Sequence, residues 1–141
     1  IIQILQGLTK AIVKYQDPSS GTWYQVTDQG AREGNYLESS ATALFIYTLA
    51  KAINKGYIGN EYIEPTQKAF DGMVKTFTRL EEDGSYTITN CCAVAGLGGD
   101  SKRYRDGSFE YYISEPIIEN DPKSVGSFIL AAIEYEKMTK K

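Results

Sequence analysis

An aromatic run with an adjacent amide, Trp23-Tyr24-Gln25, is the stretch best suited to binding a ligand. It follows Pro18-Ser19-Ser20-Gly21, whose residue types are typical of a tight turn. Residues 22–26 then read as a short extended segment. An indole presented by a loop can serve as a platform for a flat ligand, or it can pack half-buried between helices. Both interpretations of Trp23 stay open on the residues alone.

A second group of side chains that could bind a ligand lies on a later loop: Arg105, Asp106, Tyr111 and Tyr112. A guanidinium binds a carboxylate well through paired hydrogen bonds. The same residues could equally form a local ion pair that holds a long loop together. Glu38, with Ser39, falls in the first turn of a predicted helix, where an acid favours the positive end of the helix dipole. We expect Glu38 to cap that helix, with a pocket role as the alternative.

Several kinds of chemistry are excluded or disfavoured by what the sequence lacks. It contains no histidine, which excludes Ser-His-Asp and Cys-His systems and His-based zinc sites within this chain. Its two cysteines, Cys91 and Cys92, are adjacent and form neither a C-x-x-C motif nor a disulfide framework. The glycine-rich run 96–100 lacks the lysine and the strand-then-helix setting of a phosphate-binding loop. These observations favour no metal site in this chain; that it has no catalytic residue and no cofactor is implied by the resemblance described below.

Length and charge narrow the class of partner. The chain has 141 residues, which suits a single domain, and a net charge of −3. No basic run is longer than Lys140-Lys141, so we expect no nucleic-acid partner. Apolar runs fall short of the roughly 18 residues that span a bilayer, so we expect no membrane span. The first residues already read as helix interior without an N-cap, and we expect an upstream segment to precede them.

The apolar pattern predicts four main helices. Their expected ranges are 1–15, 35–55, 63–80 and 122–138, the last with Asp121 as its N-cap. The first and third are amphipathic and should be half-exposed. The second and fourth carry long stretches without charge, so they should be buried on all sides.

The helices recur in an internal pattern. Each half of the chain runs through an amphipathic helix, a glycine turn with an aromatic strand, an asparagine-led segment (Asn35 or Asn120) and an apolar helix. Such alternation predicts two helical layers, as in an α/α solenoid or a closed toroid. In a toroid the loops that enter the inner helices surround one mouth, which places Trp23 and residues 104–112 there. Two helical pairs cannot close a toroid, so we predict a portion of a larger ring.

Three ordered motifs resemble a known enzyme family. They are Gln16-Asp17-x-x-x-Gly21-x-Trp23-Tyr24-Gln25-Val26-x-Asp28, then Asn35-Tyr36-Leu37-Glu38-x-Ser40-Ala41 with Phe45-x-Tyr47-x-Leu49-Ala50-Lys51, and Arg105-Asp106-Gly107-Ser108-Phe109-Glu110-Tyr111-Tyr112 followed by Glu115 and Asn120-Asp121. The chain resembles the C-terminal part of glycoside hydrolase family 105, the unsaturated rhamnogalacturonyl hydrolases. These are related to the family 88 unsaturated glucuronyl hydrolases.

The resemblance implies a fold and an activity. The family fold is an (α/α)6 barrel, so this chain should be an all-α portion of one with short β-like turns between its helices. The family removes unsaturated uronic acid from oligosaccharides that polysaccharide lyases leave, including those from pectin. An aspartate protonates the C4=C5 enol ether, water adds at C5 and the hemiketal breaks down, without a cofactor. That aspartate and the family's Arg-Gly-Asn-Gly-Trp type segment belong to its N-terminal half and have no counterpart here, so we expect this chain to be inactive alone.

The resemblance also implies substrate contacts and partners. The residues expected to contact an unsaturated uronyl oligosaccharide are Trp23, Tyr24, Gln25, Glu38, Arg105, Asp106, Tyr111 and Tyr112. An incomplete barrel would expose apolar helix surface, so we also expect self-association. The resemblance implies a bacterial cytoplasmic or periplasmic location, and the sequence does not choose between them. Two alternative functions stay open, a non-catalytic carbohydrate-binding module and an α/α solenoid interaction module.

Overall fold

The computed structural model describes residues 1–30, 32–100 and 104–140. Helices dominate it, as predicted. The main helices are α1 (Ile2–Lys14), α2 (Ser39–Asn54), α3 (Ile63–Phe77) and α5 (Pro122–Thr139). The smaller elements are η1 (Asn60–Tyr62), α4 (Phe109–Ser114), β1 (Thr78–Leu80), β2 (Tyr86–Ile88), β3 (Cys91–Cys92) and β4 (Ile117–Ile118).

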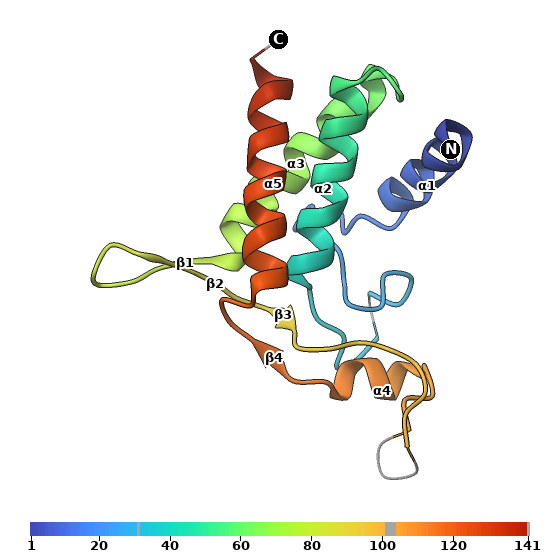
Figure 1. Ribbon diagram of the computed structural model, residues 1–141, viewed down its shortest axis with the longest axis vertical. Helices are drawn as coiled ribbons and strands as arrows, with labels where there is room; N and C mark the ends of the chain where they lie inside the picture. The colour runs from blue at the N-terminus through green and yellow to red at the C-terminus, as the bar shows by residue number, and fades with distance from the viewer. Residues whose placement is uncertain (31, 101–103, 141) are drawn as a thin grey trace.

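Two layers of helices are evident in Figure 1. Helices α2 and α5 lie side by side and run in the same direction, α3 packs behind them, and α1 lies on the flank of α2 away from α5. Small buried side chains such as Ala43 and Ala131 allow α2 and α5 to approach closely. Their far ends are joined by the Asn54 amide, which donates to the Glu134 carbonyl at 2.9 Å. The predicted two-layer, all-α arrangement is confirmed.

The predicted start is confirmed for one of the two inner helices, α5, and is wrong for the other, α2. At α5 the prediction is confirmed, because the Asp121 carboxylate accepts the Lys123 backbone N–H at 2.8 Å and caps the helix. At α2 the predicted start at Asn35 is wrong, and Glu38 caps a helix that begins at Ser39.

The two repeated asparagines hold the preceding loops instead. The Asn35 side-chain oxygen accepts the Val26 backbone N–H at 3.2 Å, and the Asn120 side-chain oxygen accepts the Ile88 backbone N–H at 2.9 Å. Each asparagine therefore ties the start of its inner-helix segment to the aromatic strand before it. The internal repeat seen in the sequence is a repeat of loop anchoring, not of helix capping.

Helix α3 ends three residues before its predicted end. Thr78, Arg79 and Leu80 form β1, which pairs antiparallel with β2 in the register Thr78↔Ile88 to Leu80↔Tyr86. Gly84, with a φ of 84°, makes the reversal between the two strands possible without strain. The cross-strand hydrogen bonds compete with the last helical turn. The apolar periodicity that predicts a helix as far as Leu80 carries no information about these cross-strand hydrogen bonds.

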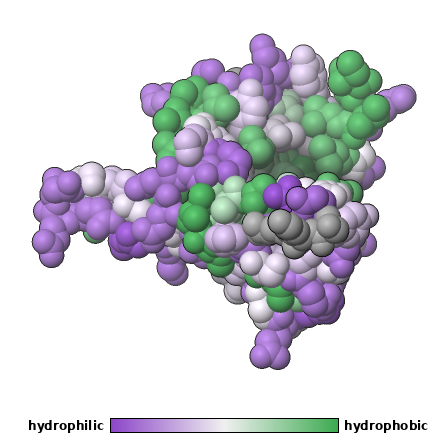
Figure 2. All heavy atoms as spheres, turned by 60° about the horizontal axis from the view of Figure 1, so that its bottom comes forward, coloured by the Kyte–Doolittle hydropathy of each residue, from purple (hydrophilic) through white to green (hydrophobic). Residues whose placement is uncertain are grey.

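Burial on all sides is not observed for α5. Its Ile129, Leu130 and Ile133 side chains are between 45% and 55% exposed. Helices α2 and α3 cover one side of α5, and no element of the described chain covers the other. Helix α1 likewise leaves Leu8 about half exposed. Figure 2 shows hydrophobic surface on both the α5 side and the α1 side, with a hollow between them.

Candidate functional site

The predicted site residues gather at the end of the molecule where α2 and α5 begin. The Trp23 loop, the β1–β2 hairpin, the β3–β4 strand pair and α4 all lie there (Figure 1). This is the arrangement expected for one mouth of a helical ring. The question is which of the predicted side chains face a cavity.

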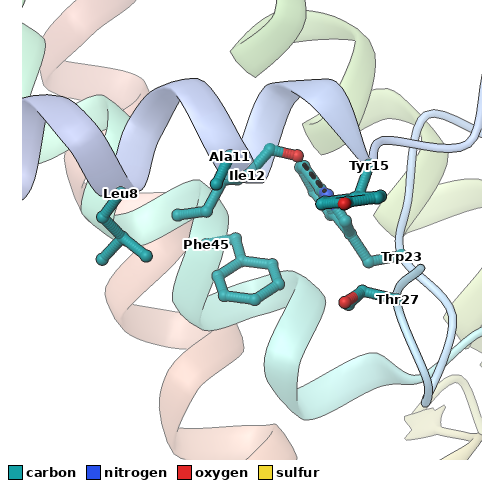
Figure 3. A pocket seen from close by; sticks show the side chains of 7 residues that line it. All are labelled: Leu8, Ala11, Ile12, Tyr15, Trp23, Thr27 and Phe45. Atoms are coloured by element: carbon teal, nitrogen blue, oxygen red, sulfur yellow. Dashed lines mark hydrogen bonds between the residues drawn. The ribbon is translucent and has the colours of Figure 1, made fainter.

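Trp23 is buried completely and does not present a stacking surface. Its indole N–H donates to the Ile12 carbonyl at 2.7 Å, and its ring lies edge-on to Phe45 with centroids 5.2 Å apart. Its backbone N–H donates to the Thr42 hydroxyl at 3.2 Å. Figure 3 shows the indole inserted between α1 and α2. Of the two roles proposed for Trp23, the structure shows packing, because the side chain is fully buried and its N–H already has a protein acceptor.

The hollow next to Trp23 is poorly suited to a sugar. It measures about 210 Å³ and its walls are almost entirely apolar; they comprise Leu8, Ala11, Ile12, Tyr15, Trp23, Thr27 and Phe45 (Figure 3). Sugar recognition needs several convergent hydrogen-bonding groups. This hollow matches an apolar side chain better than a saccharide.

A second, polar hollow brings two predicted residues together. It measures about 350 Å³ and is lined by Gln25, Val26, Thr27, Asp28, Ala95 and Tyr112. Gln25 comes from the Trp23 loop and Tyr112 from α4, 87 positions later in the sequence, yet they share this wall. An amide, a carboxylate, a hydroxyl and a phenol ring around one space are the groups that bind sugar hydroxyls and a sugar face. This hollow is the candidate functional site.

Asp28 was not among the predicted site residues, although the resemblance motif contains it. It is exposed and lies three positions after Gln25, on the same wall of the hollow. Among the described residues that line the hollow, it is the one acid. Its place in the run Gln25-Val26-x-Asp28 was the signal that could have identified it.

Arg32 joins the Trp23 loop to α4, and both of these segments line the hollow. Arg32 pairs with the Glu110 carboxylate, and its guanidinium lies 3.8 Å from the centroid of the Phe109 ring. Arg32 belongs to the Trp23 loop, whereas Glu110 and Phe109 belong to α4. The Ser108 hydroxyl caps α4 by accepting the Tyr111 backbone N–H at 3.1 Å, which fixes the helix that carries Tyr112.

Tyr24 packs within its own loop. Its ring lies against Gly30 so closely that an added Cβ there would be 2.8 Å from it. The Tyr24 backbone forms an antiparallel bridge with Leu37. The side chain is half-buried. Its predicted contact with substrate stays a prediction.

Glu38 has the capping role expected as the main possibility. It is 1% exposed, and its carboxylate accepts the backbone N–H groups of Ala41 at 2.7 Å and Cys92 at 3.0 Å. The Ser40 hydroxyl donates to it at 2.9 Å. Glu38 is thus turned into the protein, where it fastens β3 to the start of α2. The alternative pocket role does not fit this geometry.

Buried sulfur and phenol groups surround the Glu38 carboxylate. Burial raises the pKa of Tyr36, with further contributions from Cys92 and Glu38. Burial and the charge of Glu38 also raise the pKa of the Cys91 thiol. Gln25 donates to the Cys92 sulfur at 3.2 Å. The raised pKa values keep the Tyr36 phenol and the Cys91 thiol neutral near pH 7, so Cys91 does not present a thiolate. The Cys92 sulfur orients Gln25 at the edge of the candidate site.

The structure gives different contacts to the members of the second predicted group, Arg105, Asp106, Tyr111 and Tyr112. Arg105 pairs with Glu115, whose side chain is fully buried, with Nε and Oε1 3.8 Å apart. Burial and the hydrogen bond with Glu115 raise the pKa of Tyr111, whose hydroxyl accepts the Gly96 backbone N–H at 3.1 Å. Asp106 caps the turn before α4, where hydrogen bonds from Ser108 lower its pKa. Arg105 and Tyr111 therefore hold a loop together through Glu115, and Asp106 shapes the turn.

Neither a metal cluster nor a membrane span is found in the part of the chain that the structure describes. Within residues 1–30, 32–100 and 104–140, no three His, Cys, Asp or Glu side chains lie where they could share a metal ion. No helix in these ranges is both long and apolar enough to cross a bilayer.

The sequence signature of Glycosyl Hydrolase Family 88 matches residues 1–139. The chain belongs to glycosyl hydrolase family 88. This confirms the resemblance to families 88 and 105. The family 88 chain is also 37% identical over 119 residues to Protein Atu3128 of Agrobacterium fabrum and to a 24.9 kDa protein in the picA locus of Rhizobium radiobacter. It spans 51% of the length of each of these relatives.

Solved structures of family 105 enzymes share the fold. A family 105 glycoside hydrolase from C. acetobutylicum superposes with a TM-score of 0.92 at 45% identity, over 96% of this chain and 37% of that one. A possible family 105 member from Salmonella enterica superposes with a TM-score of 0.77 at 27% identity, over 99% of this chain and 32% of that one. The family 88 chain thus has the fold of part of an (α/α)6 barrel, as predicted. It corresponds to roughly a third of the solved enzymes.

Proposed function

We propose that this chain supplies part of the substrate-binding wall of an unsaturated uronyl hydrolase. Its substrates would be lyase-generated oligosaccharides that end in a 4,5-unsaturated galacturonyl or glucuronyl residue, with pectin fragments as one source. Membership of family 88 supports the reaction class. The polar hollow of Gln25, Asp28 and Tyr112 at the loop-bearing end carries the proposal, because it offers hydrogen-bonding groups and a ring at the expected mouth.

Each wall residue has a distinct task in this proposal. Gln25 is held in place by its hydrogen bond to Cys92, so its amide is oriented before a sugar arrives. Asp28 accepts hydrogen bonds from sugar hydroxyls. Tyr112 offers a ring face for stacking, and its neighbour Tyr111 lies 5.0 Å away between centroids.

We propose that the chain alone does not catalyse the hydration. The test is incubation with an unsaturated galacturonyl–rhamnose disaccharide while the absorbance of the enol ether is followed. No loss of absorbance is expected, because the family's acid has no counterpart among the motifs of this chain. Clear turnover would contradict this, and an Asp28→Asn variant would then show whether Asp28 is the acid.

Binding is tested separately from turnover by calorimetric titration of the same disaccharide. Gln25→Ala and Tyr112→Ala should each weaken binding several-fold, in line with about 1 kcal/mol per lost hydrogen bond or stacking contact. Tyr86→Ala is the matched control, because Tyr86 is an exposed aromatic on β2 outside the hollow. Equal affinity in all three variants would contradict the assignment of this hollow. Complete absence of binding would favour the interaction-module alternative.

A further inference from the structure

We infer that Glu115 is a positioning residue, which holds the Ala95 and Tyr112 side of the candidate site in the shape that receives a sugar. This role rests on the proposed function, because it concerns the hollow to which that function is assigned. Glu115 does not line the hollow, and its side chain is fully buried. It therefore acts on a bound sugar through other residues and not by touching it.

The Glu115 carboxylate connects separate parts of the loop that leads from β3 to β4. Its Oε1 lies 3.8 Å from the Arg105 Nε, and the Tyr111 hydroxyl also forms a hydrogen bond with Glu115. The same hydroxyl accepts the Gly96 backbone N–H at 3.1 Å. A hydroxyl that accepts one hydrogen bond can still donate another, so Tyr111 connects Gly96 to the carboxylate. We call this set of four residues the Glu115 network.

Two members of the Glu115 network are each one residue away from the hollow. Gly96 directly follows Ala95, and Tyr111 directly precedes Tyr112. Ala95 and Tyr112 both line the hollow, although they belong to segments 17 positions apart in the sequence. The hydrogen bond between Gly96 and Tyr111 therefore sets how far apart these two wall residues lie. Glu115 in turn fixes the position of the Tyr111 hydroxyl.

Backbone hydrogen bonds hold the same loop on either side of Gly96. The Ala93 N–H donates to the Pro116 carbonyl at 2.9 Å, next to the pairing of β3 with β4. Further along the loop, Gly98 and Arg105 exchange two backbone hydrogen bonds, of 2.8 and 2.9 Å. Gly96 lies in the interval between these two bridges. The Glu115 network fastens this interval to α4.

A buried carboxylate suits this task because moving it away from its partners is costly. A buried charge that loses its partner is strongly destabilised, so the carboxylate keeps Arg105 and the Tyr111 hydroxyl in one arrangement. A wall that is ordered before the sugar arrives loses less conformational entropy on binding. Removal of the carboxylate should therefore weaken binding even though every residue that lines the hollow is still present.

The test is calorimetric titration of the unsaturated galacturonyl–rhamnose disaccharide into the 141-residue chain and its variants. Glu115→Ala should weaken binding roughly fivefold to tenfold, the size of one lost contact. Glu115→Gln keeps the size of the side chain and takes the place of Glu115→Ala if circular dichroism shows that the latter does not fold. In a Tyr112→Ala background, Glu115→Ala should weaken binding by about twofold or less, because its effect passes through Tyr112.

Glu134→Ala is the matched control for a purely structural role. Glu134 is 9% exposed and lies on α5, where its carboxylate accepts from Asn54 at 3.1 Å and from Lys137 at 3.0 Å. Removing this second buried carboxylate should destabilise the fold and change the affinity for the disaccharide by about twofold or less. A loss of affinity equal to that of Glu115→Ala would overturn the positioning role.

Two further measurements report on the Glu115 network without any sugar. Hydrogen exchange at the Gly96 amide should accelerate in the Glu115 variants and not in Glu134→Ala. The hydrogen bond with Glu115 raises the pKa of Tyr111, so this pKa should fall in Glu115→Gln. Ultraviolet titration measures it as the difference from the same protein carrying Tyr111→Phe. Unchanged exchange together with an unchanged titration would overturn the network itself.

The titrations separate a failure of the positioning role from a failure of the proposed function. Weaker binding in Tyr112→Ala together with unchanged binding in the Glu115 variants would overturn the positioning role alone. Unchanged binding in Tyr112→Ala, or no binding by the unmodified chain, would overturn the assignment of the hollow and the positioning role with it.

Discussion

At the scale of single residues, the contacts of Trp23 distinguish a packing role from a ligand-binding role. Its loop, its neighbours and its residue type are all typical of a ligand platform. The indole N–H nevertheless finds the Ile12 carbonyl on the preceding helix, and the ring fills the junction of α1 and α2. In the proposed function, recognition is assigned to Gln25, two positions later, whose side chain lines a different hollow from that of Trp23.

Replacing Trp23 with Phe should destabilise the chain by about 2–4 kcal/mol, from a lost buried hydrogen bond and a partly collapsed cavity. Urea unfolding followed by far-ultraviolet circular dichroism measures this. Tyr24→Phe is the control and should stay within about 0.5 kcal/mol of the unmodified chain. An unchanged free energy of unfolding together with lost sugar binding would show that Trp23 is a binding residue after all.

Removing the Glu38 carboxylate should also be costly. Glu38→Ala leaves the buried backbone N–H groups of Ala41 and Cys92 without their acceptor, at about 2–4 kcal/mol. Ser40→Ala removes only one hydrogen bond to the carboxylate and should cost about 1 kcal/mol. Hydrogen exchange at the Cys92 amide should accelerate in Glu38→Ala and not in Ser40→Ala. Equal protection in both variants would contradict the link between β3 and α2.

At the scale of elements, α3 is held to the Trp23 loop by a glycine. A Cβ added to Gly72 would lie 1.9 Å from the Ser20 carbonyl oxygen, so Gly72→Ala must push α3 and the loop apart. A loss of about 3 kcal/mol or more is expected from this overpacking. Gly7→Ala is the matched control, since nothing lies within 4 Å, and it should add about 0.5–1 kcal/mol through helix propensity. Similar unfolding midpoints for the two variants would contradict the close approach.

The β1–β2 hairpin is tied to the segment before α5 by charge. Arg79 donates to Glu119 at 2.7 and 2.8 Å, and this hydrogen bonding lowers the pKa of Glu119 from its ordinary value of 4.5. Hydrogen bonds with Thr87 and then with Arg79 also lower the pKa of Glu81. A lowered pKa stabilises the fold above pH 4.5, and that contribution disappears as the pH falls through the pKa of the folded state.

Arg79→Gln should therefore lower the melting temperature slightly at neutral pH and make no difference in strong acid. Thermal melts between neutral pH and about pH 2.5 measure the gap between the two proteins. The gap should close below pH 4.5 as both carboxylates become protonated. A gap that is constant with pH would mean that Arg79 acts through packing and not through charge.

The elements also show what a sequence can and cannot predict. Four helices follow from apolar spacing, which is local information, and the Asp121-Pro122 cap of α5 is equally local. Apolar spacing predicts residues 78–80 as the last turn of a helix, because it carries no information about the cross-strand hydrogen bonds between β1 and β2. The short α4 was missed; it is held by Arg32, which lies 78 positions before Glu110. The site followed the same rule. Gln25 and Tyr112 were predicted singly, but their shared hollow with Asp28 depends on how two loops fold together.

At the scale of the whole molecule, stability should depend on protein concentration. Ile129, Leu130 and Ile133 form an exposed apolar stripe on α5, and the self-association expected from the sequence would bury this stripe only in the folded state. An assembled form would then be stabilised by mass action. The melting temperature of the unmodified chain should rise as its concentration rises, whereas that of Ile133→Glu should not. Scanning calorimetry at several concentrations makes the comparison. Parallel behaviour of the two proteins would contradict association through this stripe.

The contact between α2 and α5 has a consequence for biosynthesis. Asn54 and its partner Glu134 are 80 positions apart, so α2 leaves the ribosome long before α5 exists. At synthesis rates of roughly 5–20 residues per second, the wait lasts roughly 4–16 seconds. Throughout that interval the side of α2 that later packs on α5 lacks its partner helix, although α1 and α3 have already been made. That exposed side makes the nascent chain a natural client for chaperones that bind hydrophobic segments.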